Sequence, residues 1–473
     1  MIAYDSAVAQ LYQLGRELAH SPGQQFDLKL ECLLLDALGH PEQRFPSVLV
    51  AGTNGKGSTA ATLASILQAA GHRTALYTSP HLLRINERIC VDGHAIGDAE
   101  FAEVYERVAG CARQLVDSGA LPWHPNFFEL ITAMAFTFFA QSSVDVAVME
   151  VGLGGRLDAT NATEPVLSII ADISFDHQDF LGHTLREIAR EKAGIVHPGG
   201  TLVTLPQHPE VDEVLAKRVA ECDATLIDAT LFLPPGAHDY AQPGAENGAG
   251  AAIFGLEAPT PLQAAYPVEV MGQQIQVDSP LAGRHQWRNL ALAIAAAEQL
   301  CHHGVRLSPQ HIEHGIRRTF WPGRFQVVPA SPADGWPEIV LDVAHNPAGA
   351  WALRAALSQR YLDAGKSGSV NRPLTLVFGA MRDKPFAELA QILFPLAMHV
   401  VITRVANPRA ATPEEIRASV GSIPTNIETE DEVAGALTRA RRLAGTDGVL
   451  VITGSLYIVG EALASLPARV PRP

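Results

Sequence analysis

A glycine-rich segment between an apolar strand-like run and an apolar helical stretch carries the strongest chemical signal in the sequence. In VLVAGTNGKGSTAATLASIL, the glycines Gly52, Gly55 and Gly57 surround Lys56, and Ser58 follows. Glycines let backbone N–H groups approach phosphate oxygens, while the lysine and the helix N-terminus add positive charge. The spacing G-x-x-G-K-G-S is shorter than that of the common phosphate loop and has an extra glycine after the lysine. The segment predicts a variant phosphate-binding loop; the alternative is a glycine-rich turn whose lysine has no such role.

Two further candidates follow apolar strand-like runs. Glu150 ends VDVAVME and precedes a glycine loop, and His177 follows the predicted strand 166–173 in SFDHQDFLG. An acid at the carboxyl end of a parallel strand lies where open α/β sheets bind ligands, and Mg²⁺ prefers oxygen donors. We therefore expect Glu150 to bind a metal ion, with a solvated strand-end acid as the alternative. Imidazole gives little specificity for Mg²⁺, so a hydrogen-bonded loop histidine is the alternative for His177.

The second half of the chain offers one comparable signal. In LDVAHNPAG, Asp342 ends a predicted strand, and Asn346 with Pro347 forms an N-cap and first-position pair for a helix. On local grounds, a ligand role for this segment and a simple helix start account for these residues equally well.

The elements that must position these residues alternate along the whole chain. Strand-length apolar runs alternate with helical periods and Gly or Pro punctuation, which indicates α/β layers with mainly parallel sheets. The predicted strands are 47–51, 73–78, 144–149, 166–173 and 201–205, then 339–342, 374–378, 400–403 and 449–453. The predicted fold class is α/β, with an N-terminal P-loop-type ATPase domain (1–319), a hinge (320–337) and a C-terminal doubly wound, Rossmann-like domain (338–473).

Local signals refine this outline. Thr184 and Glu187 form a capping box for a helix that runs through Lys192, and Gly194 is placed to stop it. Residues 228–261 are rich in Ala, Gly and Pro and predict a loop or hairpin insertion, after which a helix runs from about 286 to 301. The segment TFWPGR, residues 319–324, predicts the hinge.

Composition limits the classes of function. Among 473 residues there are 35 Lys plus Arg against 50 Asp plus Glu, so no basic excess is available for duplex DNA or an anionic membrane surface. The most apolar stretch, 130–140, is too short to span a bilayer, and the start has no signal-peptide pattern. The five cysteines are scattered without C-x-x-C spacing, which fits a reducing compartment. We expect a cytoplasmic protein with small-molecule partners and without nucleic-acid or membrane partners.

The ordered motifs resemble those of the folylpolyglutamate synthases, including the bifunctional bacterial enzymes that are also dihydrofolate synthases, within the Mur ligase superfamily. The resemblance covers nearly the whole chain. It rests on GTNGKGS (52–58), SPHL (79–82), ERI (87–89), FFE (127–129), EVGLGGRLDATN (150–161), DH (176–177), REKAGI (190–195), HQWRN (285–289), PGR (322–324), DVAHNP (342–347) and TGSLY (453–457). It implies that the N-terminal domain is similar to the central domain of Mur ligases and that the protein is a monomer.

The resemblance also implies roles for individual residues. ATP would be bound between the domains by Thr53, Asn54, Gly55, Lys56, Gly57, Ser58, Asn289, Arg324, Asp342 and His345. Two Mg²⁺ ions would be bound with the help of Ser58, Ser79, Glu150 and His177. The implied catalytic residues are Lys56, His177 and Lys192, with Lys192 carbamylated, because a carbamate presents anionic oxygens to a cation and an ammonium does not. Without that modification, Lys192 is expected to be an ordinary exposed helix lysine whose replacement by alanine leaves stability nearly unchanged.

The implied reaction joins L-glutamate to a pteroyl or folyl carboxylate through an acyl phosphate, with ATP converted to ADP and phosphate. The acceptor, a reduced folate or dihydropteroate, would contact Phe128, Glu129, Leu157, Asp158 and Ala159. For Phe127 and Phe128, a place in the apolar core is the alternative. The family often has Leu-Glu-Arg near the N-terminus, where this chain has DLKLE (27–31). A Glu-Arg contact is therefore not carried over, which bears on the use of dihydropteroate.

Two other functions remain as alternatives. A Mur ligase for peptidoglycan precursors shares the loop and the acyl phosphate but is expected to carry a substrate domain ahead of the loop, where 51 residues precede Gly52. A P-loop switch or nucleotide-dependent binding module predicts ATPase activity independent of folate and glutamate. That last function leaves the REKAGI and DVAHNP segments without a role.

Overall fold

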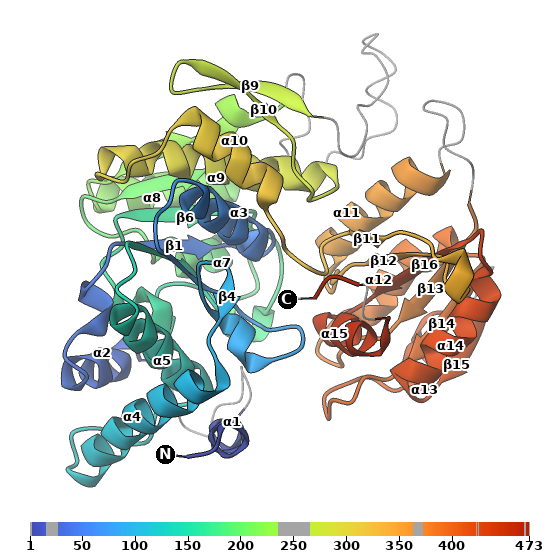
Figure 1. Cartoon of the computed structure of the whole chain (residues 1–473), viewed down its shortest axis with the longest axis horizontal. Coiled ribbons are helices and arrows are strands. Elements are labelled where there is room, and N and C mark those ends of the chain that lie inside the picture. Colours follow the sequence, from blue (N-terminus) through green and yellow to red (C-terminus); the bar gives the residue numbers. More distant parts are fainter. Residues whose placement is uncertain are drawn as a thin grey trace. The chain divides into compact units, whose positions relative to one another are not determined.

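The computed structural model describes residues 2–15, 27–234, 265–362, 372–421, 423, 425–467 and 470–472. They form two compact units, each built around its own large sheet (Figure 1). The first comprises the described residues up to 234 together with Tyr266–Val277 and Arg288–Thr319; the second comprises Asp278–Trp287 and the described residues from 320 onwards. Both units are α/β, as the alternation of elements predicts. Most of the predicted insertion, residues 235–261, lies outside the described residues.

The large sheet of the first unit has, in the described part of the chain, the strand order β4-β3-β2-β5-β1-β6-β7-β8. Neighbours from β2 to β8 pair in parallel, whereas β3 and β4 are antiparallel. Because β5, β1 and β6 are adjacent and parallel in the middle of the sheet, the loops after them meet at the centre of its carboxyl edge. The strands are β1 (Ser47–Ala51), β2 (Thr74–Tyr77), β3 (Ile89–Val91), β4 (His94–Ala95), β5 (Val146–Glu150), β6 (Leu167–Ile170), β7 (Thr201–Thr204) and β8 (Thr225–Asp228).

Helices and a small hairpin complete the first unit. The helices are α1 (Tyr4–Gln13), α2 (Leu28–Ala37), α3 (Lys56–Ala69), α4 (Asp98–Asp117), α5 (Phe127–Gln141), α6 (Gln178–Leu181), α7 (Leu185–Ala193), α8 (Pro209–Glu221), α9 (Arg284–His302), which belongs to this unit from Arg288 onwards, and α10 (Pro309–Arg318). The apolar helix α5 packs with α1, α2 and α4 in the main core of this unit. Helix α10 approaches α3 so closely that a Cβ on Gly315 would lie 2.3 Å from Ile66 Cα. The hairpin consists of β9 (Tyr266–Val270) and β10 (Gln273–Val277).

The sheet of the second unit has the order β11-β12-β16-β13-β14-β15 among the described residues. Only its edge strand β11 is antiparallel, and helices lie on both sides of the sheet (Figure 1). The strands are β11 (Gln326–Val328), β12 (Glu338–Leu341), β13 (Leu374–Phe378), β14 (His399–Thr403), β15 (Asn426–Glu430) and β16 (Val449–Thr453); the helices are α11 (Pro347–Leu357), α12 (Phe386–Leu393), α13 (Pro413–Ser419), α14 (Val433–Ala444) and α15 (Leu456–Ser465). The unit is doubly wound, as predicted.

The structure corrects several predicted boundaries. Strand β6 ends at Ile170 and not at residue 173, so His177 does not directly follow the strand; it lies at the N-cap of the short helix α6. The capping box of Thr184 and Glu187 is present at the start of α7. Helix α7 ends at Ala193 with Gly194 as its C-cap, as predicted, although Gly194 has right-handed helical backbone angles (φ −61°) and not the left-handed conformation common at this position. Among the described helices, none combines the length and apolarity needed to cross a lipid bilayer.

Candidate active site

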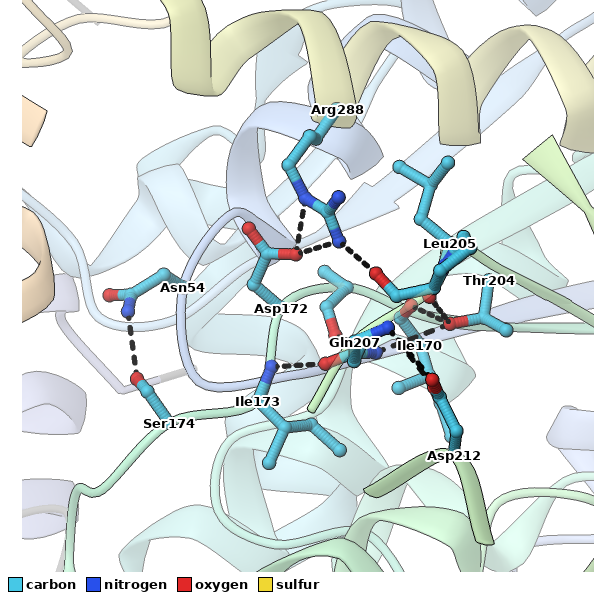
Figure 2. A network of polar contacts seen from close by, with 12 residues as sticks. Asn54, Ile170, Asp172, Ile173, Ser174, Thr204, Leu205, Gln207, Asp212 and Arg288 are labelled. Carbon is cyan, nitrogen blue, oxygen red and sulfur yellow. Dashed lines mark hydrogen bonds and ion pairs between the residues drawn. The ribbon is translucent and has the colours of Figure 1, made fainter. Parts of the chain in front are cut away.

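The phosphate loop predicted from the sequence connects β1 to α3, and the segment after β6 holds it in place. The backbone N–H groups of Thr53 and Asn54 both donate to the carbonyl oxygen of Asp172, at 2.7 and 3.2 Å. The Thr53 hydroxyl donates to the Ser174 carbonyl at 3.0 Å. The Asn54 amide donates to the Ser174 hydroxyl at 3.2 Å (Figure 2). The start of the loop is therefore fixed by contacts outside itself.

An ion pair secures this supporting segment to helix α9. Arg288 Nε donates to Asp172 Oδ1 at 2.7 Å, and Arg288 Nη2 lies 2.7 Å from the same oxygen and 3.0 Å from the Pro206 carbonyl (Figure 2). Gln207 extends the network, because its side-chain oxygen accepts the Ile173 N–H at 2.7 Å. Sequence reasoning assigned no role to Arg288 or Asp172. The HQWRN motif (285–289) could have indicated Arg288, because Arg288 directly precedes Asn289, which the resemblance assigns to ATP binding.

That assigned residue, Asn289, lies directly against the phosphate loop. Gly55 is the N-cap of α3 with φ 86°, and a Cβ added there would lie 2.2 Å from Asn289 Oδ1. A glycine is thus required at position 55 both for its backbone angle and for this close approach. Among the residues that the structure describes, no side chain caps the start of α3. The first N–H groups of α3, from Lys56 to Ser58, are therefore placed to bind an anion.

Two lysines meet at one carbonyl oxygen of the loop. Lys56 Nζ donates to the Gly52 carbonyl at 3.0 Å and to the Thr53 carbonyl at 3.3 Å, and Lys192 Nζ donates to the same Gly52 oxygen at 2.7 Å. Lys192 is only 4% exposed. The expectation of an ordinary exposed helix lysine is therefore wrong, because the face of α7 that carries Lys192 packs inward.

Burial has a direct chemical consequence for Lys192. Removal from water, reinforced by the positive charge of Lys56, lowers the pKa of the Lys192 amine from 10.5 to about 7. Near neutral pH a substantial fraction of this amine is therefore unprotonated and nucleophilic. An exposed lysine at the same pH is almost entirely an ammonium ion.

The four predicted metal ligands come from four different segments of the first unit. Glu150 is the last residue of β5 and is 5% exposed, so the alternative of a solvated strand-end acid is wrong. Its Oε2 accepts the Ser79 N–H at 3.2 Å, which brings these two residues together. Ser58 is 2% exposed in the first turn of α3. His177 has φ 49°, and its Nε2 lies 3.8 Å from an oxygen of Asp176.

The donor set is compatible with magnesium. Mg²⁺ in phosphoryl-transfer sites takes only one or two carboxylates and completes its shell with water and substrate phosphates. Glu150 and the serine hydroxyls are oxygen donors of this kind, and they lie beside a loop suited to phosphate. Within the described ranges no group of three or more His, Cys, Asp or Glu side chains is close enough to hold a metal ion by itself.

The glycine loop after β5 is braced by Asp158 and α7. Asp158 is 5% exposed; its Oδ2 accepts the Leu153 N–H at 2.9 Å and its Oδ1 accepts the Thr160 N–H at 3.1 Å. Burial raises the pKa of this carboxyl. A Cβ on Gly155 would lie 2.8 Å from the Lys192 carbonyl oxygen. The loop and the helix carrying Lys192 thus position each other, and Asp158 has a clear structural role.

The remaining predicted acceptor residues lie around this loop. Phe127 is a core residue, 2% exposed and stacked on Tyr12 with ring centroids 5.6 Å apart. Phe128 is half-buried, and its ring lies so close to Gly152 that a Cβ there would be 2.3 Å from Phe128 Cζ. Glu129 is also half-buried, and its Oε2 accepts the Asn126 N–H at 2.8 Å as part of the capping box of α5. Burial raises the pKa of Glu129. Leu157 is half-buried and Ala159 is buried.

In the second unit, the predicted residues lie at the end of β12. Asp342 is 8% exposed; its two oxygens accept the Phe325 N–H at 2.8 Å and the Ala344 N–H at 2.9 Å, and burial raises its pKa. Arg324 is half-buried, and its positive charge opposes that rise. His345 Nδ1 lies 2.9 Å from the Val343 carbonyl, to which it donates.

The Asn-Pro pair after β12 does start a helix. The Asn346 side chain accepts the Gly349 N–H at 2.8 Å, and Pro347 is the first residue of α11. The helix-start interpretation of this pair is therefore confirmed. The carboxyl end of β12 nonetheless gathers an aspartate, an arginine and a histidine at the edge where sheets of this type bind ligands.

Family models match both halves of the chain. Residues 50–226 match the Mur ligase middle domain, and residues 323–456 match the Mur ligase glutamate ligase domain. The chain is also similar to the dihydrofolate synthase/folylpolyglutamate synthase of Bacillus subtilis, with 34% identity over 435 residues. That match covers 90% of this chain and 92% of the relative.

Solved structures agree with these matches. The folylpolyglutamate synthase of Mycobacterium tuberculosis complexed with ADP and AMPPCP has a TM-score of 0.82 and 29% identity, covering 99% of this chain and 100% of the other. The bifunctional folylpolyglutamate synthase/dihydrofolate synthase of Yersinia pestis, complexed with AMPPNP and Mn ion, has a TM-score of 0.76 and 28% identity, covering 98% of each. The predicted resemblance, fold class and enzyme class are confirmed. The chain belongs to the folylpolyglutamate synthase/dihydrofolate synthase family of ATP-dependent Mur ligases.

Proposed function

We propose that this chain joins the amine of L-glutamate to the carboxylate of a folate acceptor, using the residues around the phosphate loop as its phosphoryl-transfer site. The observation that carries the assignment of the site is the pair of amines of Lys56 and Lys192 on the carbonyl oxygen of Gly52. The positive charge of Lys56 on a phosphate loop suits a reaction in which negative charge accumulates on a transferring phosphoryl group, and Lys192 lies at the same point of the loop. Reduced folates and dihydropteroate are both candidate acceptors.

The reaction proceeds in two balanced steps. A carboxylate oxygen of the acceptor attacks the terminal phosphorus of ATP, the bond to the bridging oxygen breaks, and ADP leaves with that electron pair. The glutamate amine then attacks the acyl carbon of the resulting acyl phosphate. The tetrahedral species collapses with departure of phosphate, and the amine loses a proton as the amide forms. No side-chain nucleophile is required.

The chain contributes positioning and charge to these steps. The N–H groups at the start of α3 bind phosphate oxygens, and Lys56 offsets negative charge on the phosphoryl group. Thr53 and Asn54, held by the Asp172 carbonyl, fix the loop before substrate arrives, so little reorganisation is needed. Asn289 closes the loop at Gly55. In the second unit, Arg324, Asp342 and His345 are assigned to the nucleotide by the resemblance alone.

One or two magnesium ions would be held by Glu150, Ser79, Ser58 and His177 and would neutralise charge on the phosphate oxygens. The buried Glu150 and the half-buried Ser79, whose N–H donates to Glu150, support this assignment most directly. The structure of the Yersinia pestis relative complexed with AMPPNP and Mn ion supports a divalent metal in the family. His177 has the weakest support, because imidazole is not a preferred Mg²⁺ ligand.

Lys192 carries a carbamate in the active protein. The unprotonated amine attacks carbon dioxide, a C–N bond forms, and one proton is lost to solvent, which leaves an anionic carbamate. The pKa of about 7 supports this step, because an amine that stayed protonated at neutral pH would not react. The carbamate would place negative oxygens beside Lys56, where an unmodified ammonium adds a second positive charge.

A phosphate-release assay with ATP, magnesium and L-glutamate tests the proposal. Phosphate release is expected only when a folate acceptor is present, and the product should be the acceptor extended by one glutamate. Dihydropteroate and a tetrahydrofolate are compared as acceptors in parallel reactions. Brisk ATP hydrolysis that is unaffected by acceptor and glutamate would instead indicate a nucleotide-dependent switch. Isotope-labelled bicarbonate, followed by NMR, tests the carbamate by its dependence on Lys192.

A further inference from the structure

Two motifs of the sequence, SPHL (79–82) and ERI (87–89), lie at the two ends of one loop between β2 and β3. These strands are antiparallel neighbours, so the ends of the loop meet. The Thr78 N–H donates to the Arg88 carbonyl at 3.1 Å and closes the loop. We refer to residues 79–84 as the Ser79 loop. The ERI motif has no part in the proposed reaction, yet it is brought next to the segment that carries a proposed metal ligand.

Glu87, the first residue of the ERI motif, binds successive backbone N–H groups of the Ser79 loop. Its Oε2 accepts the Leu82 N–H at 2.8 Å, and its Oε1 accepts those of Leu83 and Arg84 at 2.9 and 2.6 Å. The bond to Arg84 belongs to the cap of the short helix η2 (Ile85–Arg88). The bonds to Leu82 and Leu83 lie ahead of that helix start. Both oxygens of Glu87 are therefore occupied by the main chain of one loop.

The cap of helix α4 provides a comparison for Glu87. Glu100 accepts the Gly97 N–H at 3.0 Å, which is the kind of contact that a helix start requires. Glu87 is half-buried, and burial raises its pKa, whereas the three N–H groups and the positive charge of Arg88 oppose that rise. Hydrogen bonds to a charged group are stronger than those between neutral groups. Glu87 thus holds more backbone than a helix cap does.

The position of Ser79 depends on these contacts. Its N–H donates to Glu150 Oε2 at 3.2 Å, which places the loop beside the last residue of β5. Residues 79–81 lie between two anchored points, the hydrogen bond that closes the loop and the first N–H group bound by Glu87. Such a short segment, fixed at both ends, has little conformational freedom. Ser79 is therefore held beside Glu150 before any ligand is bound.

We infer that Glu87 is a positioning residue for the magnesium site, because it fixes the Ser79 loop so that Ser79 stays next to Glu150. This inference rests on the proposed function, in which these two residues bind magnesium, and adds to it a residue that sets the affinity of the site. Both Glu87 oxygens are engaged by backbone N–H groups, so Glu87 acts through the loop and not as a ligand. Loss of a residue that orients a metal ligand typically weakens metal binding about 10- to 100-fold.

Mn²⁺ binding to the full-length protein, measured by electron paramagnetic resonance in the presence of AMPPNP, tests this role without turnover. Native protein is compared with Glu87→Gln, in which one acceptor oxygen becomes a donor group that opposes the loop N–H groups. The dissociation constant for Mn²⁺ is expected to rise about 10- to 100-fold. The affinity for AMPPNP without a metal should stay within about twofold. Ligase turnover at low magnesium should fall and should return when magnesium is raised, which a purely structural role of Glu87 does not predict.

A matched control and a double variant make the test specific. Glu100→Gln alters a glutamate cap at the start of α4, outside the Ser79 loop, and should leave the Mn²⁺ affinity within about twofold of native. Ser79→Ala removes the hydroxyl through which Glu87 is inferred to act. Adding Glu87→Gln to Ser79→Ala should then cause little further loss of Mn²⁺ affinity, because the effects of coupled residues are not additive.

The possible outcomes distinguish this inference from the proposed function. A folded Glu87→Gln with native Mn²⁺ affinity shows that Glu87 does not position the site, and the proposed function still stands. The same conclusion follows if the loss in Glu87→Gln adds in full to the loss in Ser79→Ala. If the native protein itself binds no Mn²⁺ beside AMPPNP, the metal site of the proposed function has failed, and this inference fails with it.

A second variant covers the case in which circular dichroism shows that Glu87→Gln does not fold. Glu87→Asp keeps the negative charge, but its side chain is one methylene shorter and does not reach all three N–H groups. The dissociation constant for Mn²⁺ is then expected to rise roughly threefold or more. Native Mn²⁺ affinity in a folded Glu87→Asp would overturn the inference.

Discussion

Replacing Lys192 by methionine is expected to stabilise the first unit while removing ligase activity. Methionine is close to lysine in length and brings no charge into the interior. In the native chain, the lowering of the Lys192 pKa from 10.5 to about 7 means that the folded state disfavours the ammonium form. At roughly 1.4 kcal/mol for each tenfold change, this corresponds to about 4–5 kcal/mol at neutral pH.

Loss of one hydrogen bond offsets part of this gain. The Lys192 amine donates to the Gly52 carbonyl at 2.7 Å, a bond worth about 1 kcal/mol. The carbonyl is not left without a partner, because Lys56 also donates to it at 3.0 Å. The expected net gain for Lys192→Met is therefore roughly 3 kcal/mol in the free energy of unfolding at about pH 7.

The stability difference between Lys192→Met and the native protein is expected to depend on pH. Between about pH 7 and 10.5, the unfolded chain holds the lysine proton and the folded chain does not, so the native protein gains stability as the pH rises through this window. The advantage of Lys192→Met should therefore be greatest at or below about pH 7 and should largely vanish near pH 10. Urea unfolding in buffer free of bicarbonate and magnesium measures it, because the amine is then unmodified.

A surface lysine provides the control. Lys217 is 76% exposed in its side chain and pairs with Glu221 at 3.9 Å, so Lys217→Met should change stability by no more than about 0.5 kcal/mol at either pH. The reasoning is refuted if Lys192→Met is destabilised equally at both pH values. Full ligase turnover in Lys192→Met would refute the proposed role of the amine and its carbamate.

Three further substitutions test the site. Gly55→Ala should reduce turnover at least about 100-fold and weaken nucleotide binding in calorimetry, because its Cβ would lie 2.2 Å from Asn289 Oδ1. Arg288→Met should weaken nucleotide binding about tenfold with the fold intact by circular dichroism, because it releases the aspartate whose carbonyl holds the loop. Glu150→Gln should raise the magnesium concentration for half-maximal activity about 10- to 100-fold; an unchanged magnesium dependence would contradict the metal assignment.

Two controls accompany these variants. Gly71 has the same φ of 86° as Gly55 but no atom within 4 Å of an added Cβ, so Gly71→Ala shares the backbone strain without the collision. Nucleotide binding should survive in Gly71→Ala, and an equal loss in both variants would show that strain alone is responsible. Arg317 forms an exposed pair with Glu313 at 2.9 Å, and Arg317→Met should leave the nucleotide affinity unchanged.

Features that depend on neighbouring residues in the chain were predictable from the sequence. The bounds of β1 and the phosphate loop after it follow from an apolar run, glycines and a lysine within one short segment. The capping box at Thr184 likewise involves residues three apart. The β9–β10 hairpin carried a signal that was not used: apolar residues at every second position in YPVEV and in QIQV, on either side of Met271 and Gly272, which are both at positive φ.

Features that arise from packing were not predictable. The burial of Lys192 depends on how α7 lies against the glycine loop, and the amphipathic pattern of a charged helix does not reveal it. The contact of Arg288 with Asp172 joins residues 116 positions apart. Strand β15, with the sequence NIETE, lacks a fully buried face, so it does not have the apolar alternation by which strands are recognised.

The hydrogen bonds from the phosphate loop to the Asp172 carbonyl oxygen have a practical consequence for mutagenesis. The acceptor of the Thr53 and Asn54 N–H groups is a main-chain oxygen, so no change of side chain at position 172 removes it. A conventional alanine scan would therefore not detect the contribution of these two hydrogen bonds, which are the anchor of the loop. Proline at position 53 or 54 deletes a donor, although it also fixes φ, and an ester in place of one amide bond would delete it with least disturbance. Backbone chemistry, more than side-chain replacement, is the tool that can measure what this anchor contributes.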